Sequence, residues 1–342
     1  MPPNILVFGT GALGSVYTWV LSKAIPASNI YAICRSNYAA ASQDGFTINS
    51  QLWGDGLRVR PKVSRTMDEA TSLLKEAAGQ DAMFDYILIT AKALPTTPST
   101  AEIIAPAVTR GVDGSTIVLV QNGIGIEPPF AEMYPENPLL STVAYLPATQ
   151  TKPGVIQHKE VELLHVGTYP ASPADGLRVR HKERAKEFAG LIKKGGASVE
   201  VHEDIQTQRW GKLLVNGSWN PICALSRCRD VQFMDSSKEE DEGANFVRDV
   251  MLEIAKIAQA CGYSGIDEKL VNHQMGRAKV RALPGVQPSM LADVLSSRGL
   301  EADAIVGNAV RIAKEKGVDV PMLRTLYFLS KALSRSFELD QS

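Results

Sequence analysis

Three polar side chains, Lys212, Asn216 and Asn220, recur every four residues within the otherwise apolar stretch 206–226. On an α-helix this spacing places them along one stripe. A partly buried lysine ammonium can protonate a carbonyl oxygen as it becomes an alkoxide, because burial lowers its pKa toward neutrality. Amides can bind hydroxyl, carbonyl or carboxylate groups. The stripe therefore predicts one wall of a polar pocket, the alternative being that Lys212 is a surface cation lying along Trp210.

A glycine-rich turn near the N-terminus predicts a dinucleotide site. It follows the apolar run 4–8 and opens a helical pattern that reaches Leu21. In the G-x-G-x-x-G fingerprint the first glycine makes a tight turn, the second lets the backbone approach a pyrophosphate, and the third packs helix against strand. The helix N-terminus then offers N–H groups to the phosphates, whereas the alternative is a purely structural turn. The expected cofactor-binding residues here are Gly9, Thr10, Gly11, Ala12, Leu13 and Gly14.

The end of the next apolar run, 30–34, favours NADP(H) over NAD(H). An NAD site usually has Asp or Glu there, about 20 residues past the glycines, to bind the ribose 2′-hydroxyl. This chain instead has Arg35, Ser36 and Asn37, and the first acid that follows is Asp44. A guanidinium can make paired, charge-assisted hydrogen bonds to a 2′-phosphate. We therefore expect Arg35 to bind that phosphate, the alternative being a solvated loop residue.

Two further apolar runs, 84–90 and 116–120, are followed by Lys92 and Asn122. In an open parallel sheet, ligands bind beyond the carboxyl ends of the strands. We therefore expect both side chains at the nicotinamide, with Asn122 also reaching the substrate. Taken singly, Asn122 could be a turn former before Gly123, and Lys92 a solvated cation.

The rest of the chain divides into an α/β part and a helical part, at a boundary near residues 203–205. Residues 1–204 are predicted to form an NADP-binding domain, and residues 205–342 an all-helical domain with the substrate and catalytic groups. The first domain should contain a hairpin (45–50 and 57–63), helices at 67–78 and 174–194, antiparallel strands at 141–146, 154–158 and 161–166 that close the sheet, and an edge strand at 199–202. The second should contain helices at 206–226, 243–260, 303–316 and 322–333, another that starts at Leu291, a kink at Pro221 and a loop from 262 to 288.

Composition excludes several classes of protein. The 342 residues suffice for two domains, and the formal net charge of -1 gives no electrostatic footprint for nucleic acid or an anionic membrane. No apolar run approaches the roughly 18–20 residues that span a bilayer, and the first strand begins too early for a targeting segment. The four cysteines are scattered and the five histidines lack ligand spacing. We therefore expect reduced thiols, no metal site and a soluble, cytoplasmic protein.

Taken together, these motifs resemble the ketopantoate reductase (2-dehydropantoate 2-reductase) family, and their order and spacing agree over nearly the whole chain. The resemblance implies an α/β N-terminal Rossmann domain, an all-α C-terminal domain like that of 6-phosphogluconate dehydrogenase, and a cleft between them. It also implies NADPH-dependent reduction of 2-dehydropantoate, a small 2-oxo acid, to pantoate. The matching elements are G-x-G-A-L-G at 9–14, Lys92, Gln121-Asn122-Gly123, K-x-x-x-N-x-x-x-N-P at 212–221, Ser289-Met290-Leu291-x-Asp293 and Glu301.

The resemblance assigns roles to individual residues. Lys212 matches the general acid, and Glu301 matches a carboxylate that keeps the lysine charged and oriented. Asn216, Asn220 and Ser289 match substrate-binding positions. Arg35 matches the ligand of the 2′-phosphate, and Lys92 and Asn122 match residues at the nicotinamide and substrate end. The apolar faces of an all-helical domain are compatible with a homodimer.

Two positions depart from the family pattern, because Asp230 and Val286 stand where amides are expected. This difference is predicted to weaken binding of an anionic, hydroxylated substrate, unless the basic residues at 277, 279 and 281 compensate. It leaves open a different 2-oxo acid or a less polar ketone. A separate alternative is a hydroxyacid dehydrogenase that uses the same K-x-x-x-N helix and works by oxidation. A non-catalytic NADP-binding redox sensor is the alternative from another class, although such a protein has no need of a general acid.

Overall fold

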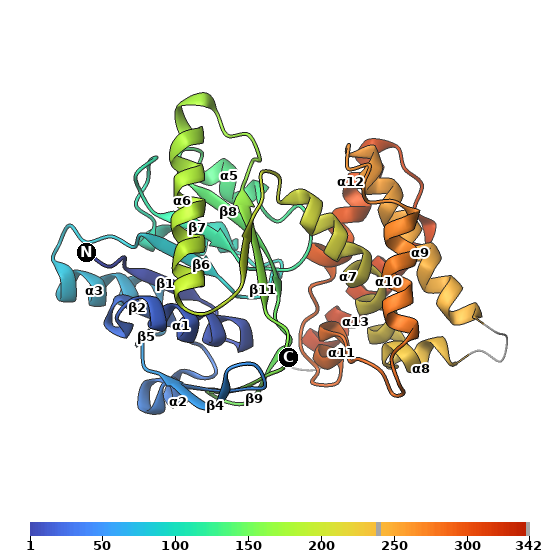
Figure 1. Ribbon diagram of the computed structural model, residues 1–342, viewed down its shortest axis with the longest axis horizontal. Helices are drawn as coiled ribbons and strands as arrows, with labels where there is room; N and C mark the ends of the chain where they lie inside the picture. Colours follow the sequence, from blue (N-terminus) through green and yellow to red (C-terminus); the bar gives the residue numbers. More distant parts are fainter. Residues whose placement is uncertain (237–240, 340–342) are drawn as a thin grey trace. The chain divides into compact units, whose positions relative to one another are not determined.

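The computed structural model describes residues 1–236 and 241–339, which form two compact units (Figure 1). The sheet unit comprises Met1–Lys92, Thr96–Gln121 and Glu127–Ile205. The helical unit comprises Ala93–Pro95, Asn122–Ile126 and the described residues from Gln206 onward. The chain therefore contributes two short segments to the helical unit before the main division after Ile205.

The sheet unit is built on an eight-stranded sheet of order β12-β11-β8-β7-β6-β1-β2-β5. The six strands from β5 to β8 in this order pair in parallel, whereas β11 is antiparallel to β8 and parallel to β12. The central strands are continuous apolar runs because both faces of the sheet are covered. Their bounds are β1 Ile5–Phe8, β2 Ile30–Ile33, β5 Lys62–Ser64, β6 Tyr86–Ile89, β7 Thr116–Leu119, β8 Leu139–Tyr145, β11 Leu163–Thr168 and β12 Val199–Val201.

Helices pack on this sheet where their sequences are apolar on one side. α1 (Ala12–Ala24) packs beside α6 (Asp175–Lys194), and Phe188 and Ile192 of α6 are fully buried. α3 spans Met67–Ala78 as predicted, because the Thr66 hydroxyl caps its N-terminus by accepting from the Glu69 N–H. The short helices are α2 Tyr38–Asp44, α4 Thr100–Ile103 and α5 Pro128–Met133, with single turns η1 Ala27–Asn29 and η2 Ala105–Ala107.

A second sheet, of order β4-β3-β10-β9, packs against α1. The hairpin of β3 (Phe46–Ser50) and β4 (Gly54–Val59) confirms one prediction, although residues 62 and 63 of the predicted second arm belong to β5 of the main sheet. The prediction that residues 154–158 close the main sheet is wrong. This stretch forms β10 (Val155–His158), between β3 and β9 (Ala148–Lys152), because Ile156 pairs with Ile48 and both side chains are fully buried.

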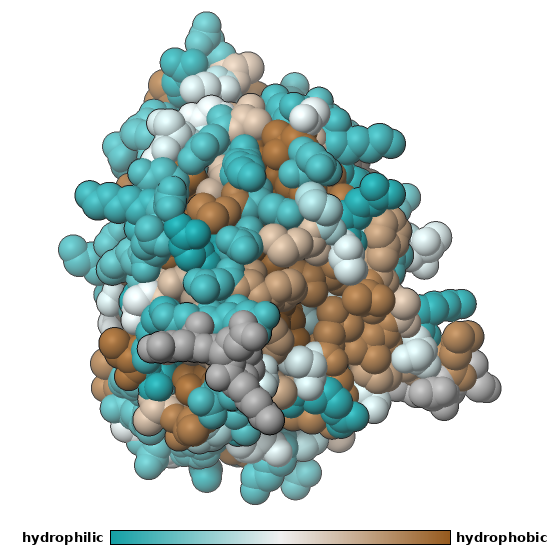
Figure 2. Space-filling model, turned by 90° about the vertical axis from the view of Figure 1, so that its right-hand side faces the viewer, coloured by the Kyte–Doolittle hydropathy of each residue, from teal (hydrophilic) through white to brown (hydrophobic). Residues whose placement is uncertain are grey.

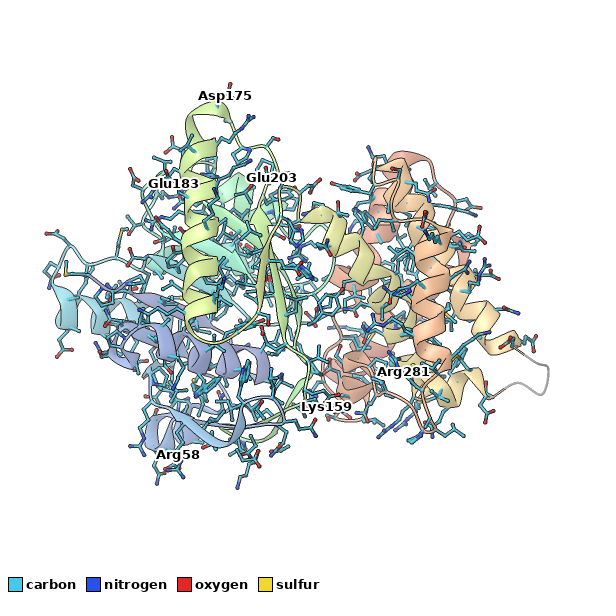
Figure 3. All side chains as sticks on the ribbon, viewed as in Figure 1. Arg58, Lys159, Asp175, Glu183, Glu203 and Arg281 are labelled. Atoms are coloured by element: carbon cyan, nitrogen blue, oxygen red, sulfur yellow. The ribbon has the colours of Figure 1, made fainter. Side chains whose placement is uncertain are left out.

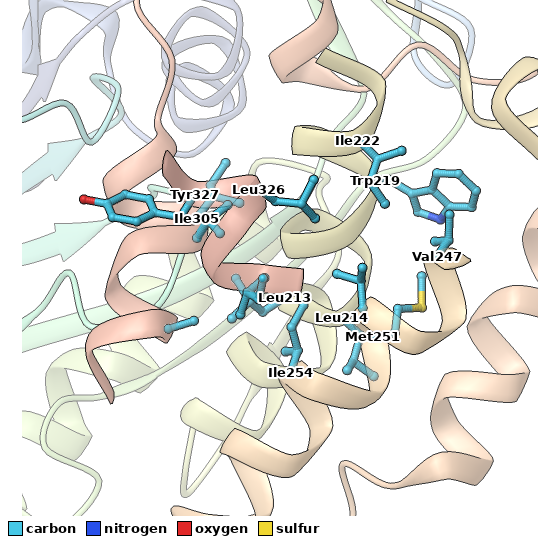
Figure 4. Packing of buried hydrophobic residues seen from close by; sticks show 14 of the residues in the cluster. Leu213, Leu214, Trp219, Ile222, Val247, Met251, Ile254, Ile305, Leu326 and Tyr327 are labelled. Carbon is cyan, nitrogen blue, oxygen red and sulfur yellow. The ribbon is translucent and has the colours of Figure 1, made fainter. Parts of the chain in front are cut away.

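The helical unit is organised around α7 (Gln206–Ser226), which has the predicted bounds and continues through Pro221. It packs against α9 (Glu242–Ala260), α11 (Ser289–Val294) and α13 (Pro321–Leu339). Figure 4 shows Leu213 and Leu214 of α7 among Met251 and Ile254 of α9. A Cβ at Gly217 would lie 2.8 Å from Ile254 Cδ1, so Ile254 packs directly against the backbone of α7 at this position. The remaining elements are α8 Asp230–Met234, η3 Asp303–Gly307, which is a π-helical turn, and α12 Asn308–Lys316.

The loop predicted from 262 to 288 is wrong, because it contains α10 (Glu268–Lys279). Asp267 caps this helix by accepting from the Leu270 N–H at 2.9 Å. Val271, Met275 and Ala278 are buried at the four- and three-residue spacing of a helical face. This signal is short and is embedded among charged residues. Within the described residues, no helix combines the length and the apolar character needed to cross a bilayer.

Candidate active site

The glycine-rich turn has the geometry of a pyrophosphate cradle. Gly9 has a φ of +96°, and a Cβ there would lie 2.3 Å from the Ala91 nitrogen. A Cβ at Gly14 would lie 2.6 Å from Thr90 Oγ1, so the first and third glycines pack against the end of β6. Gly11 is exposed, and an added Cβ there would meet no atom within 4 Å. The open side of the turn, beside Ala12 and Leu13 at the start of α1, therefore fits the phosphates of a dinucleotide.

The end of β2 holds this turn in place. Thr10 is buried, and its hydroxyl donates to the Ile33 carbonyl at 3.0 Å. The Asn37 side-chain amide donates to the Thr10 carbonyl at 2.6 Å, so this amide supports the turn rather than reaching a 2′-phosphate. Arg35 and Ser36 are exposed at the strand end, where Arg35 can bind an anionic group. Lys92 is also exposed, directly after Ala91.

Lys212 lies half-buried on α7, and its ammonium donates to the Asn122 side-chain oxygen at 2.8 Å. Burial lowers the pKa of Lys212 to about 8, and the positive charge of Arg209 acts in the same direction. The negative charge of Glu301 acts in the opposite direction. The structure therefore brings together Lys212 and Asn122, which the sequence places 90 residues apart, and gives the lysine a pKa suited to proton transfer near neutral pH.

Asn122 belongs to the short segment Asn122–Ile126, and contacts of this segment with η3 fix its position. Gly123 has a φ of +103°, and a Cβ there would lie 2.3 Å from the Ala304 carbonyl oxygen. The Ile124 N–H donates to that same oxygen at 3.1 Å. Only a glycine permits both this backbone conformation and this approach, so the position of Asn122 depends on the residue that follows it.

Arg209 is a component of the site that sequence reasoning missed. Its side chain is buried, and its guanidinium donates to the Gly123 carbonyl at 2.8 Å. Arg209 therefore both fixes the segment that carries Asn122 and lowers the pKa of Lys212. Its position one helical turn before Lys212, in a stretch otherwise rich in apolar residues, is a signal that could have identified it.

Glu301 is buried, and its carboxylate accepts from the Ala93 N–H at 2.8 Å. This bond attaches Ala93–Pro95, the other short segment of the helical unit, to the chain just before η3. The carboxylate also raises the pKa of Lys212 by its charge. The role of Glu301 as the partner that orients the lysine stays a prediction.

Beyond Lys212, the α7 stripe contains Asn216 and Asn220, and part of the Asn220 side chain is used to hold the helical unit together. Asn216 is half-buried one turn beyond Lys212. Asn220 is buried, and its side-chain oxygen accepts from the Met290 N–H at 3.0 Å and from the Ser289 hydroxyl at 3.2 Å. These bonds occupy both lone pairs of the Asn220 oxygen and join α7 to the start of α11. What Asn220 can offer a substrate is therefore its amide N–H₂, beside the exposed Ser289.

Asp230, the acidic departure from the family pattern, belongs to the scaffold. It is 1% exposed, and one carboxylate oxygen accepts from the N–H groups of Val231 at 2.8 Å and Val286 at 2.6 Å. The other oxygen forms an ion pair with Arg281, which is labelled in Figure 3. The negative charge is thus neutralised within the protein, and it fixes the segment that carries Val286 in front of α11.

Asp230→Ala is expected to lower the free energy of unfolding by about 3 kcal/mol, because it leaves two part-buried N–H groups and a half-buried guanidinium without their acceptor. Denaturant unfolding measures this difference. Asp235→Ala, which removes an exposed carboxylate at the end of the same helix, is the matched control and should change stability by less than about 0.5 kcal/mol. Equal stability of the two variants would remove Asp230 from the scaffold.

Comparison with known protein families gives matches over most of the chain. Residues 5–171 match the family model described as ketopantoate reductase PanE/ApbA. Residues 204–334 match the model described as ketopantoate reductase PanE/ApbA C terminal. The chain is also 28% identical over 330 residues to the 2-dehydropantoate 2-reductase of Nostoc sp., and the match covers 96% of this chain and 94% of the relative.

Solved structures give the same picture. The 2-dehydropantoate 2-reductase from Methylococcus capsulatus has a TM-score of 0.79 and 30% identity, over 98% of this chain and 97% of that one. The ternary structure of D-mandelate dehydrogenase with NADH and anilino(oxo)acetate has a TM-score of 0.78 over 98% and 99% of the two chains. Its identity of 18% supports similarity of fold alone. The expected combination of an α/β N-terminal domain and a helical C-terminal domain is confirmed.

Proposed function

This chain belongs to the ketopantoate reductase family, and from that premise we propose that it reduces a small 2-oxo acid with NADPH, 2-dehydropantoate being the leading substrate. The observation that carries the proposal is the contact between Lys212, with its pKa of about 8, and Asn122. An ammonium of this pKa is partly charged and partly neutral near physiological pH, as a proton donor that is regenerated in each cycle must be.

Bound NADPH would supply the hydride that adds to the carbonyl carbon of the substrate. The open side of Gly9–Gly14 would hold its pyrophosphate at the N-terminus of α1, where backbone N–H groups and the helix dipole favour negative charge. Arg35 would bind the 2′-phosphate, and Lys92 would contribute a positive charge beyond the end of β6.

Lys212 would act on the substrate oxygen. As the hydride adds to carbon, the carbonyl π electrons move to oxygen, and the Lys212 ammonium stabilises that charge and then donates a proton to it. The resulting neutral amine recovers its proton from water. Asn122 would hold the Nζ atom during this step, and Arg209 would favour release of the proton by lowering the lysine pKa.

The stripe beyond Lys212 would bind the rest of the substrate. Asn216 and the Asn220 amide group offer N–H donors to a carboxylate or hydroxyl, and the Ser289 hydroxyl offers an acceptor beside them. Asp230 supports this arrangement indirectly, since it pairs with Arg281 and accepts from the Val286 N–H in front of α11.

The decisive experiment is the loss of NADPH absorbance with 2-dehydropantoate and with a panel of other 2-oxo acids and ketones. Turnover that is fastest with 2-dehydropantoate supports the leading substrate. Faster turnover of another 2-oxo acid keeps the chemistry and changes the substrate. Intact NADPH binding with no turnover of any compound contradicts the proposal and supports a redox sensor.

The pH profile tests the lysine directly. Only charged Lys212 can donate a proton, so kcat for reduction should be constant well below pH 8 and fall above it, by roughly tenfold per pH unit. Arg209→Met removes a positive charge that lowers the Lys212 pKa, so the falling limb should move to higher pH. Arg209→Lys keeps a positive charge and is the matched control. A limb that stays in place in Arg209→Met would exclude Lys212 as its source.

The homodimer and the cytoplasmic location stay predictions. The helical unit exposes Phe328 and Leu329 of α13 at 55% and 52%. Figure 2 shows that apolar side chains gather in patches between polar ones on the face seen there. Light scattering of the purified protein would decide its oligomeric state.

A further inference from the structure

A cluster of two histidines and a glutamate lies at the edge of the main sheet. Glu200 of β12 pairs directly with His165 of β11, so these side chains stand opposite each other on one face. His202 is two residues beyond Glu200 and therefore projects from that same face of the chain. In Figure 3 the label of Glu203 marks the residue that follows His202. Local spacing gave no sign of this cluster, because 37 residues separate the two histidines.

Three potential ligand atoms converge at this point. His165 Nδ1 lies 2.8 Å from His202 Nε2 and 3.2 Å from a Glu200 carboxylate oxygen, and that oxygen lies 3.6 Å from His202 Nε2. Ligands bound to Zn²⁺ at about 2.0–2.1 Å in tetrahedral geometry lie roughly 3.3–3.4 Å apart. The mean separation here is close to that value. A single ion could therefore bind all three atoms after shifts of about half an ångström.

We propose that His165, Glu200 and His202 bind one divalent transition-metal ion, with Zn²⁺ as the first candidate. Imidazole nitrogen and carboxylate oxygen are ligands that suit such ions. A set of three protein ligands leaves a fourth position for water. The expectation of no metal site came from spacing along the chain, whereas the site is formed by pairing between two strands.

The surroundings favour a site that forms reversibly. His165 is buried, with the Tyr145 ring edge-on at 5.7 Å between ring centres, and this contact helps to fix the imidazole. The Glu200 side chain is 56% exposed, so an ion has access from solvent. β12 has only three residues and lies at the end of the strand order. An ion bound by both strands would tie this short edge strand to β11.

The test is isothermal titration of the full-length protein with Zn²⁺ after treatment with a chelator. One equivalent is expected to bind to the wild-type protein. Loss of one ligand of three, in Glu200→Gln or His202→Ala, should weaken binding by more than the roughly 10–100-fold that loss of an outer-shell partner costs. His273→Ala, which removes an exposed histidine of α10, is the matched control and should bind as the wild type does.

Two further measurements distinguish a metal-binding site from side chains that are only hydrogen-bonded to one another. Co²⁺ in a site with three protein ligands should give the visible absorption of a four-coordinate ion, and this absorption should be lost in both ligand variants. Zn²⁺ should raise the melting temperature of the wild-type protein and of His273→Ala, but not of Glu200→Gln. Binding that Glu200→Gln and His202→Ala leave unchanged, or the absence of binding in the wild type, would overturn the proposal.

Discussion

Lys212→Ala is expected to lower kcat for NADPH-dependent reduction by roughly 10²–10⁴-fold, the range for loss of a general acid. The variant removes the only group shown to donate to Asn122 Oδ1 among the described residues, and with it the charge that would stabilise the substrate oxygen. Because the glycine-rich turn belongs to the sheet unit and Lys212 to the helical unit, NADPH should still bind. Steady-state kinetics and NADPH fluorescence measure the two effects separately.

Lys314→Ala is the matched control for this variant. It removes an exposed lysine from α12 of the same unit and should leave kcat unchanged. Thermal unfolding of both proteins identifies any loss of activity that reflects loss of fold. A Lys212→Ala enzyme that turns over at the wild-type rate would remove Lys212 from the mechanism, whatever its pKa.

Arg35→Asp is expected to weaken the binding of NADPH by roughly 10²-fold or more, while the affinity for NADH should change little. A hydrogen bond to a charged group contributes about 1.5–3 kcal/mol, and the new carboxylate adds repulsion of the 2′-phosphate. NADH carries a hydroxyl at that position, for which Asp is a suitable partner. Titration of the two cofactors against each protein gives the ratio.

The control for cofactor choice is Arg58→Asp, an equal change of charge at an exposed position of β4, labelled in Figure 3. It tests whether net charge alone alters NADPH binding, and it should leave the ratio of NADPH to NADH affinity as it is in the wild type. If Arg35→Asp lowers the affinity for NADPH and for NADH equally, either the 2′-phosphate binds elsewhere or the protein does not distinguish it from the 2′-hydroxyl of NADH.

Local patterns along the chain were sufficient to predict much of the fold and the polar stripe of α7 that carries Lys212. The bounds of α3 and α7 agree with the spacing of their apolar residues, and the Thr66 cap marks the start of α3. Both signals lie within or next to the helix concerned. The prediction that Lys212 and Asn122 line one pocket used a helical stripe and a strand end, whereas the direct hydrogen bond between them was not predicted. Each of these features needs only a short stretch of chain and one general rule of sheet topology.

The features that were missed depend on distant parts of the chain. Nothing around residue 156 indicates which of two sheets it joins, because an apolar residue on a short strand fits either. The structural role of Asp230 could not be predicted, because its ion-pair partner Arg281 is 51 residues away in the sequence. In the same way, His165 and His202 have no local signal of each other. Long-range pairing therefore limits prediction of polar clusters more than it limits prediction of helices.

The two short segments at Ala93–Pro95 and Asn122–Ile126 have a consequence for how this protein can be divided. The C-terminal helices contain Lys212 but not Asn122, and they contain Glu301 but not the Ala93 N–H that it binds. A fragment cut at residue 206 would therefore be an incomplete module, because it would lack the groups that bind Lys212 and Glu301. Recombination between relatives at that boundary should succeed only when both parents supply compatible residues at 93–95 and 122–126.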